Sequence, residues 1–197
     1  INMPGFDLNL EVNNAWFQYP DLPSKIDKIA IKINANREEG PDLDNLKVNI
    51  DKFYFEFLKN KVDISLKLED VMSDPNIDSR IQSYLDLSQL GQVMPLADGE
   101  NYSGIITSDI ILKGRMSAIE KEQYENFQAK GDLKINKMIY NSPAFGFPMT
   151  VDSLLFKFSP QSLNLAFLEA KFGESDISVN GNLTNYLAYY LRGETIK

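Results

Sequence analysis

Histidine and cysteine are both absent from this chain of 197 residues. Without histidine there is no Ser–His or Cys–His catalysis, no imidazole metal ligand and no histidine pH switch. Without cysteine there is no disulfide, no thiol nucleophile, no zinc knuckle and no iron–sulfur ligation. A chain without cysteine suits a reducing and an oxidising compartment equally, so this absence does not fix the location of the protein.

The chain has fewer positive than negative side chains, and it has no long apolar run. The 28 Asp and Glu outnumber the 20 Lys and Arg, which gives a formal net charge of −8. A nucleic-acid surface needs clustered Lys and Arg, so we expect no nucleic-acid partner. No apolar run approaches the ~18 residues that span a bilayer. Because the chain starts at Ile1 without a signal stretch and stops at Lys197 in a β-like run, we interpret it as a fragment of a longer protein.

Most of the chain alternates apolar and polar residues, which is typical of strands with one buried face. These segments are enriched in Ile, Val, Phe and Tyr, as strands prefer. The main apolar runs are Leu8, Leu10 and Val12; Ile29, Ile31 and Ile33; Leu46, Val48 and Ile50; Phe53, Phe55 and Phe57; Val62, Ile64, Leu66 and Leu68; Leu154, Phe156 and Phe158; and Leu163, Leu165 and Phe167.

Turn residues separate these runs at Glu39–Asp42, Asp98–Asn101, Gly173-Glu174 and Asn180–Asn182. Short strands joined in sequence by tight turns favour an antiparallel arrangement over βαβ units. We therefore predict a mostly β fold, a repeated antiparallel meander that forms a curved sheet or groove, with one or two short helices.

Three segments are candidates for the helices. Thr184–Leu191 is followed by a basic residue and glycine, which is a helix-stop signal. Glu120–Gln128 is short and charged and fits either a helical turn or a loop. Asp74–Leu96 fits both helical and strand spacing. There we favour a strand to about Leu87 and then a helix over Ser88–Met94, because the following proline disfavours a longer one.

Residues 10–33 and 133–158 align as an internal repeat when Gly146-Phe147 is treated as an insertion. Generic β alternation accounts for part of this match. The repeat predicts a single β-rich fragment, 1–197, with repeat halves at 1–74 and 98–197 joined by 75–97. The aligned pairs include Leu10 with Leu133, Val12 with Ile135, Asn13 with Asn136, Ile31 with Phe156 and Ile33 with Phe158.

From about residue 75 onward the chain resembles the C-terminal region of the AsmA family. The most specific motif is a small-residue turn, an alternating strand, Gly-Asn-Leu and a short helix, over Phe172–Leu187. Residues 1–74 share only the β pattern. The other segments that carry the resemblance are Tyr102-Ser103-Gly104, Leu112-Lys113-Gly114, Phe127–Ile135 and Val151–Leu154.

The resemblance implies a large periplasmic protein of Gram-negative bacteria, anchored to the inner membrane by an N-terminal helix that lies outside this chain. AsmA-like proteins are implicated in outer-membrane biogenesis and lipid homeostasis. They are related to TamB and to bridge-like lipid-transfer proteins, whose curved sheet forms a long groove with an apolar floor. A phospholipid or other acyl lipid is therefore the implied partner, with membrane contact through other parts of the parent chain. No enzyme activity and no cofactor are implied.

The apolar strand faces have two interpretations. They form either a packed core, as most alternating strands do, or a groove lined for acyl chains. Composition alone favours the core, and the resemblance raises the weight of the groove. The candidate groove lining consists of Phe53, Phe55, Phe57, Phe156, Phe158, Leu163, Leu165 and Phe167.

The sequence selects no catalytic or metal-binding group. Its acidic clusters lack the spacing of a calcium loop, and nothing selects a pair of carboxylates for glycoside hydrolysis. Trp16, Phe17 and Tyr19 form either a carbohydrate-stacking patch or a packing cluster at a strand end. The acidic clusters are Asp42 and Asp44; Asp70, Asp74 and Asp78; and Glu120, Glu122 and Glu125.

We therefore expect a non-enzymatic periplasmic envelope protein that acts in outer-membrane biogenesis and lipid homeostasis through an apolar β groove for lipid. The alternative is a β-sandwich adhesion or scaffold module that binds protein or glycan.

Overall fold

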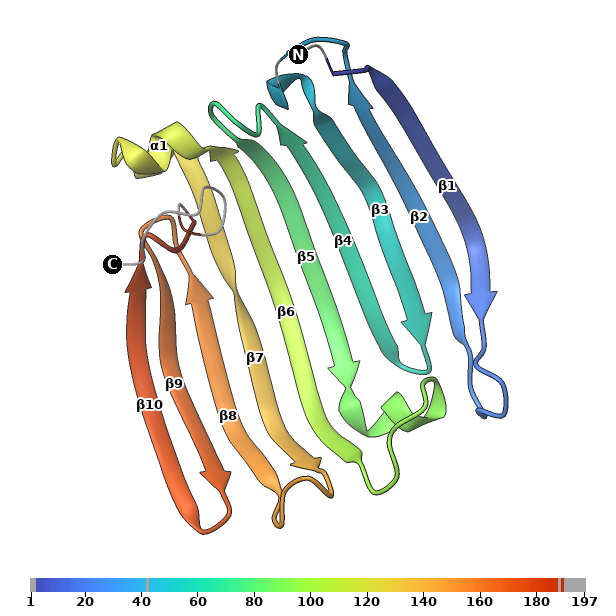
Figure 1. Cartoon of the computed structure of the whole chain (residues 1–197). Helices are drawn as coiled ribbons and strands as arrows, with labels where there is room; N and C mark the ends of the chain where they lie inside the picture. The colour runs from blue at the N-terminus through green and yellow to red at the C-terminus, as the bar shows by residue number, and fades with distance from the viewer. Residues whose placement is uncertain (1–2, 42, 188, 190–197) are drawn as a thin grey trace.

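Ten strands form one antiparallel sheet in the computed structural model, which describes residues 3–41, 43–187 and 189 (Figure 1). The strands lie in the sheet in chain order, and the sheet is curved and unclosed. The predicted antiparallel meander is therefore confirmed. The strands are β1 (Phe6–Phe17), β2 (Ile26–Arg37), β3 (Lys47–Phe57), β4 (Asn60–Glu69), β5 (Asn76–Asp86), β6 (Asn101–Arg115), β7 (Phe127–Asn141), β8 (Met149–Phe158), β9 (Ser162–Phe172) and β10 (Ser175–Thr184).

Short turns join the strands, but the sequence marks only some of them. Gly173, with a φ of 62°, turns the chain between β9 and β10 as its position predicted. The turn between β3 and β4 places Leu58 at a φ of 53°, a left-handed conformation with no glycine to signal it. The prediction of a turn at Asn180–Asn182 is wrong, because these residues lie inside β10, opposite a bulge in β9.

Four short helices that lie wholly within the described residues stand at the strand ends: η1 (Leu43–Asn45), η2 (Leu87–Gln92), α1 (Met116–Glu120) and η3 (Tyr124–Asn126). The ambiguous segment 74–96 resolves into β5 followed by η2, close to the predicted division. The charged segment 120–128 contains the end of α1, all of η3 and the first residues of β7. Of the helix predicted over 184–191, Tyr186, Leu187 and Tyr189 are helical, whereas residues 188, 190 and 191 lie outside the described part of the chain.

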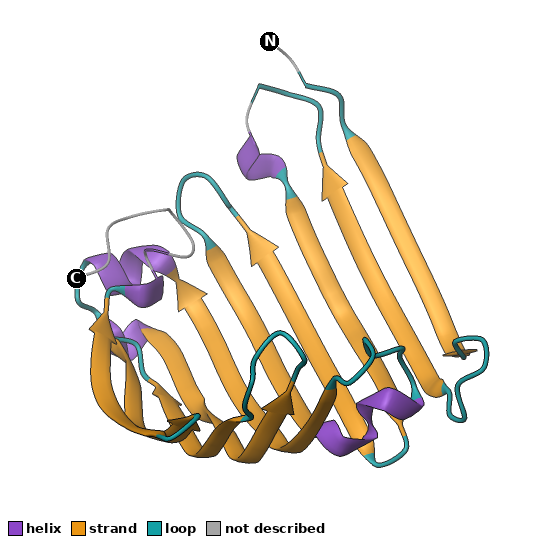
Figure 2. Ribbon diagram, turned by 60° about the horizontal axis from the view of Figure 1, so that its bottom comes forward, coloured by secondary structure: helices purple, strands orange, loops and turns teal. Residues whose placement is uncertain are grey.

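Strands β7–β10 curl away from the plane of β1–β5, which gives the sheet an inner and an outer side (Figure 2). Gly131 of β7 lies at the start of this curl and has a φ of 121°. A Cβ atom on Gly131 would lie 1.9 Å from the backbone oxygen of Asp109 in β6, so only glycine allows this close approach. Bulges in six of the nine strand pairs add further local bending.

The two hairpins of the predicted repeat share one feature and differ in another. Asn14 and Lys137, which the repeat aligns, both have left-handed backbones with φ near 50°, and both lie at bulges, Asn14 in the pairing of β1 with β2 and Lys137 in the pairing of β7 with β6. Leu10 pairs with Ile33, however, whereas Leu133 pairs with Phe156, so the registers of the two hairpins differ by two residues. The segment 75–97 contributes β5, which pairs with β4 and β6, so the sheet continues through it.

Fully buried side chains gather at the two ends of the strands, on the inner side of the sheet. At the upper end in Figure 1, residues of α1 and Tyr186-Leu187 pack on Ile77, Phe127 and Ala129. At the lower end, Phe57, Leu87 and Val93 are buried where η2 lies against the sheet. Between these two ends most of the sheet carries no second layer within the described residues, so most of its apolar side chains are only half-buried, with Ile110 of β6 a buried exception.

Candidate functional site

The inner side of the sheet is a mostly apolar surface, which we call the apolar face. The strand registers place one cross-strand row of side chains on this face from the first strand to the last. Neighbouring rows are also apolar, with small residues such as Ser79 and Ser108 on the central strands β5 and β6. The row consists of Val12, Ile31, Phe53, Ile64, Ile81, Ile110, Gly131, Phe158, Leu163 and Leu183.

The apolar face is large and accessible. Nine strand spacings of ~4.8 Å make it about 43 Å wide across the strands. Its middle is half-buried, and at the free edge the side chains of Phe6, Leu8 and Leu10 are 48%, 56% and 44% exposed. A sandwich core would bury the same positions under a second sheet. In the described part of the chain all ten strands belong to a single sheet, so the apolar face is open to solvent or to a ligand.

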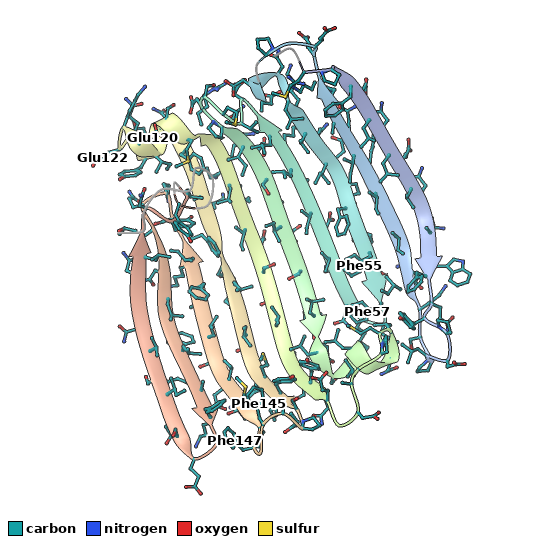
Figure 3. The ribbon with its side chains drawn as sticks, in the orientation of Figure 1. Phe55, Phe57, Glu120, Glu122, Phe145 and Phe147 are labelled. Atoms are coloured by element: carbon teal, nitrogen blue, oxygen red, sulfur yellow. The ribbon has the colours of Figure 1, made fainter. Side chains whose placement is uncertain are left out.

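Seven of the eight predicted lining residues lie on the apolar face. Phe53 and Phe55 lie on β3, Phe156 and Phe158 on β8, and Leu163 and Leu165 on β9, with register partners that are apolar or glycine. Phe57 also lies on this face but is only 4% exposed, at the lower end where Leu87 of η2 is buried as well. Figure 3 shows Phe55 and Phe57 close together near the lower end of β3.

Phe167 is the eighth predicted residue, and its placement on the apolar face is wrong. A bulge in β9 at Ala166 interrupts the alternation of side chains. As a result Phe167 pairs with Leu155 on the outer face, and Leu168 takes its place opposite Leu154. Phe167 is 40% exposed there. The alternating pattern of the sequence does not reveal a bulge, so this one-residue shift could not be predicted from it.

A segment that we call the lower cap, residues 87–94, covers the lower edge of the apolar face. Asp86 begins it by accepting hydrogen bonds from the backbone N–H of Ser88 at 3.1 Å and from its hydroxyl at 2.6 Å. The buried side chain of Asn60 donates to Gln89 Oε1 at 2.9 Å and accepts a hydrogen bond from the backbone of Asp86. These contacts fix the cap to the β3–β4 turn.

A second lower segment, residues 142–148 between β7 and β8, brings aromatic rings to the same edge. The ring of Phe147 lies 4.7 Å from that of Phe172 in edge-to-face geometry, and Phe145 approaches the same ring at 6.0 Å. Tyr102 and Tyr140 stack beside them at 4.7 Å. Figure 3 shows Phe145 and Phe147 below β7 and β8. The lower edge is therefore covered at two places along the sheet.

The upper edge is covered by the buried cluster around α1, which we call the upper cap. Met116 is fully buried there, and the Tyr186 hydroxyl donates to the Ser159 carbonyl at 3.1 Å. Burial raises the pKa of Tyr186 to about 12. The α1 backbone is held by Asp74, which accepts from the N–H and the hydroxyl of Ser117 at 2.8 Å. Among the residues that the structure describes, the two caps leave the apolar face open from β1 to β10.

The one cavity with a wholly apolar lining among those found in the described part lies at the β1–β3 end of the apolar face. Its volume is about 230 Å³, which is below the range of cavities that enclose a drug-sized ligand and suits part of an alkyl chain. The alternating isoleucines of β2 were predicted to form a strand, but they were not among the predicted lining residues. The cavity is lined by Phe17, Ile26, Ile29, Ile31, Phe53, Tyr54 and Phe55.

The outer face of the sheet is hydrated and charged, with ion pairs that cross from strand to strand. Lys52 contacts Asp63 at 2.7 Å and Lys113 contacts Asp78 at 2.6 Å, each with both side chains substantially exposed. Glu56 accepts hydrogen bonds from Lys28 and from the hydroxyl of Tyr54. The hydrogen bond to Lys28 lowers the pKa of Glu56, and the bond between Tyr54 and Glu56 raises the pKa of Tyr54 to about 12.

The predicted acidic clusters have structural partners. Asp70 pairs with Arg115 at 2.8 Å, and Asp44 accepts from the backbone of Met72 and Ser73 at 2.7 and 2.8 Å. Asp42 lies outside the described residues. Glu120 and Glu122 flank the upper cap (Figure 3). Among the described residues, no three acidic side chains converge in a way that could hold a metal ion.

Comparison with known proteins adds no relative: no family model, no curated protein and no solved structure matches this chain. Within the described residues, every helix is too short or too polar for a membrane span.

Proposed function

We propose that this chain is a non-enzymatic protein that holds the acyl chains of lipids against its apolar face. The observation that supports this is the apolar face itself, which extends across ten strands and which the described residues cover only at its two edges. Monomeric soluble proteins rarely expose contiguous apolar patches larger than a few hundred Å², and those that do use them for binding.

The dimensions of the apolar face suit acyl chains. A bilayer has a hydrocarbon core of ~30 Å, so one acyl chain is roughly 15 Å long. The face is about 43 Å wide, which leaves room for more than one chain between the caps. Each buried CH₂ contributes about 0.8 kcal/mol, so ten of them supply roughly 8 kcal/mol before the cost of ordering the chain.

The charged outer face fits the same role. Its ion pairs keep that side in water, so the two sides of the sheet meet different environments. The resemblance to AsmA proteins extends the proposal to a role in the periplasm, in outer-membrane biogenesis and lipid homeostasis, with the parent protein anchored to the inner membrane.

The test is direct. The protein is purified without detergent, its lipids are extracted and identified by mass spectrometry, and the delipidated protein is titrated with a fluorescent fatty acid. We expect co-purified acyl lipid and saturable fatty-acid binding. A protein that carries no lipid and binds no fatty acid, but is retained on a glycan or protein surface, would identify a scaffold module instead.

A further inference from the structure

Four large apolar side chains are exposed together at the lower end of β1–β4, and we call this group the aromatic corner. Trp16, Phe17 and Tyr19 are 65%, 51% and 44% exposed, and Leu58 is 49% exposed. Phe17 and Tyr19 contact each other edge to face at 6.0 Å. Trp16 extends from the outer side of β1, because its neighbours Ala15 and Phe17 pair with Ile29 and Ile26 on the apolar face.

The members of the corner come from turns that lie side by side at one end of the molecule (Figure 1). A depression of about 510 Å³ is lined both by the β1–β2 connection and by Leu58 of the β3–β4 turn. The lower cap reaches the same place, because Ser24 donates its backbone N–H to the carbonyl of Gln92 at 3.0 Å. Two turns and the lower cap therefore form one surface.

The charges around the corner differ from those of the chain as a whole. The two segments that form it, residues 16–28 and 56–61, carry four lysines and three carboxylates, a small positive excess in a chain whose net charge is −8. Lys28 and Lys25 contact carboxylates at 2.6 and 3.4 Å and are still at least half exposed. Long lysine side chains beside aromatic rings are typical of surfaces at the boundary between lipid and water. The charged residues are Lys25, Lys28, Lys59, Lys61, Asp21, Asp27 and Glu56.

The corner also adjoins the interior of the apolar face. Phe17 belongs to the corner and at the same time lines the apolar cavity of about 230 Å³ together with Ile26 and Phe55. An alkyl chain that leaves a membrane at the corner would therefore meet apolar side chains without crossing charged ones.

We infer that the aromatic corner docks on the surface of a phospholipid bilayer and is the place where acyl chains pass onto the apolar face. This inference rests on the proposed acyl-chain binding and adds the site of membrane contact. Tryptophan and tyrosine combine an apolar ring with a polar group and favour the headgroup region of a bilayer. The lysines then face the phosphates of anionic lipids.

The sole tryptophan of the chain makes the test specific, because its emission reports on Trp16 alone. The full chain is titrated with vesicles of phosphatidylcholine that contain phosphatidylglycerol as the minor component. We expect a blue shift of the emission, and quenching when the phosphatidylcholine carries bromine on its acyl chains. No shift and no quenching would overturn the inference. A shift that depends on protein concentration without vesicles would also overturn it, because the patch would then be a contact between copies.

A double variant, Tyr19→Ser with Leu58→Ser, keeps the reporter and removes half of the corner. We expect its vesicle affinity to fall about tenfold, which corresponds to ~1.4 kcal/mol. The matched control is Met72→Ser, which removes a side chain that is 64% exposed in the β4–β5 connection at the opposite end of the strands. An equal loss in the control would overturn the inference.

Fatty-acid binding without vesicles separates this inference from the proposed function. Normal fatty-acid binding with no response of Trp16 to vesicles would refute membrane docking at the aromatic corner and leave the apolar face as the lipid site. A response to vesicles without any fatty-acid binding would refute the proposed function and, with it, the passage of acyl chains at the corner.

Discussion

Leu165→Glu places one carboxylate on the apolar face and distinguishes an open binding surface from a packed core. Leu165 is half-buried in β9, opposite Phe156 on one side and Gly181 on the other. In a packed core the carboxylate would be buried without a partner, at a cost of several kcal/mol. On the open apolar face it reaches water, and the loss is about 1 kcal/mol of apolar burial and strand propensity.

These two costs predict different melting temperatures. For a chain of this size 1 kcal/mol corresponds to a shift of roughly 2–4 °C, so we expect a decrease of that order, whereas a buried charge would lower the midpoint by about 10 °C or more. Fatty-acid affinity should fall at least tenfold, because the carboxylate needs water where the acyl chain would lie. Thermal unfolding followed by circular dichroism and titration with a fluorescent fatty acid measure the two effects.

Leu155→Glu is the matched control on the neighbouring strand. Leu155 is also half-buried, but it lies on the outer face opposite Lys134, which can pair with the new carboxylate. We expect little change in fatty-acid binding. The reasoning would be refuted if Leu165→Glu abolished cooperative unfolding, or if both variants reduced binding equally.

Three further outcomes follow from the structure. Asn60→Ala, which leaves the polar groups of the lower cap unpaired, should destabilise the protein by about 2–3 kcal/mol and lower its melting temperature by at least 4 °C; an unchanged midpoint would show that the cap is not held there. Gly131→Ala should cost about 3 kcal/mol or more because its new Cβ meets a backbone oxygen, while Gly181→Ala, with nothing within 4 Å, should be nearly neutral by the same measurement. The pKa of Tyr54, raised to about 12 by the hydrogen bond to Glu56, lies above the value of 10 in an unfolded chain, so the contribution of this pair is complete below pH 10 and is lost as the pH rises towards 12; absorbance titration should show the late ionisation, and Tyr54→Phe should remove it.

The sequence was sufficient for the β architecture and for most of the candidate lining, because alternation encodes which side chains share a face. Alternation alone was enough to place Phe53, Phe156 and Leu165 on the apolar face. The predicted face of Phe167 was wrong because a bulge adds one residue to β9. A single added residue moves every later side chain to the other face.

Turns and caps were less predictable, for a different reason. Leu58 adopts a left-handed conformation that its side chain does not favour, so the surrounding sheet imposes it. The glycine at position 181 suggested a turn, yet it lies within a strand because the pairing with β9 continues past it. Whether the apolar face is covered depends on which segments fold back over it, and such contacts between distant residues leave no local pattern.

The strictly sequential strand order has a consequence for how this protein unfolds. Each strand is hydrogen-bonded only to its neighbours in the chain, so stability is close to a sum of contributions from adjacent strand pairs, as in a repeat array. The outer strands β1 and β10 can detach without disturbing the centre, whereas β6 and β7 are protected from both sides. A force applied to the two ends of the chain would therefore peel the sheet strand by strand, with bonds broken one after another rather than sheared together. Local opening would begin at the free edges, where a flexible lipid chain could take the place of the side chains that leave.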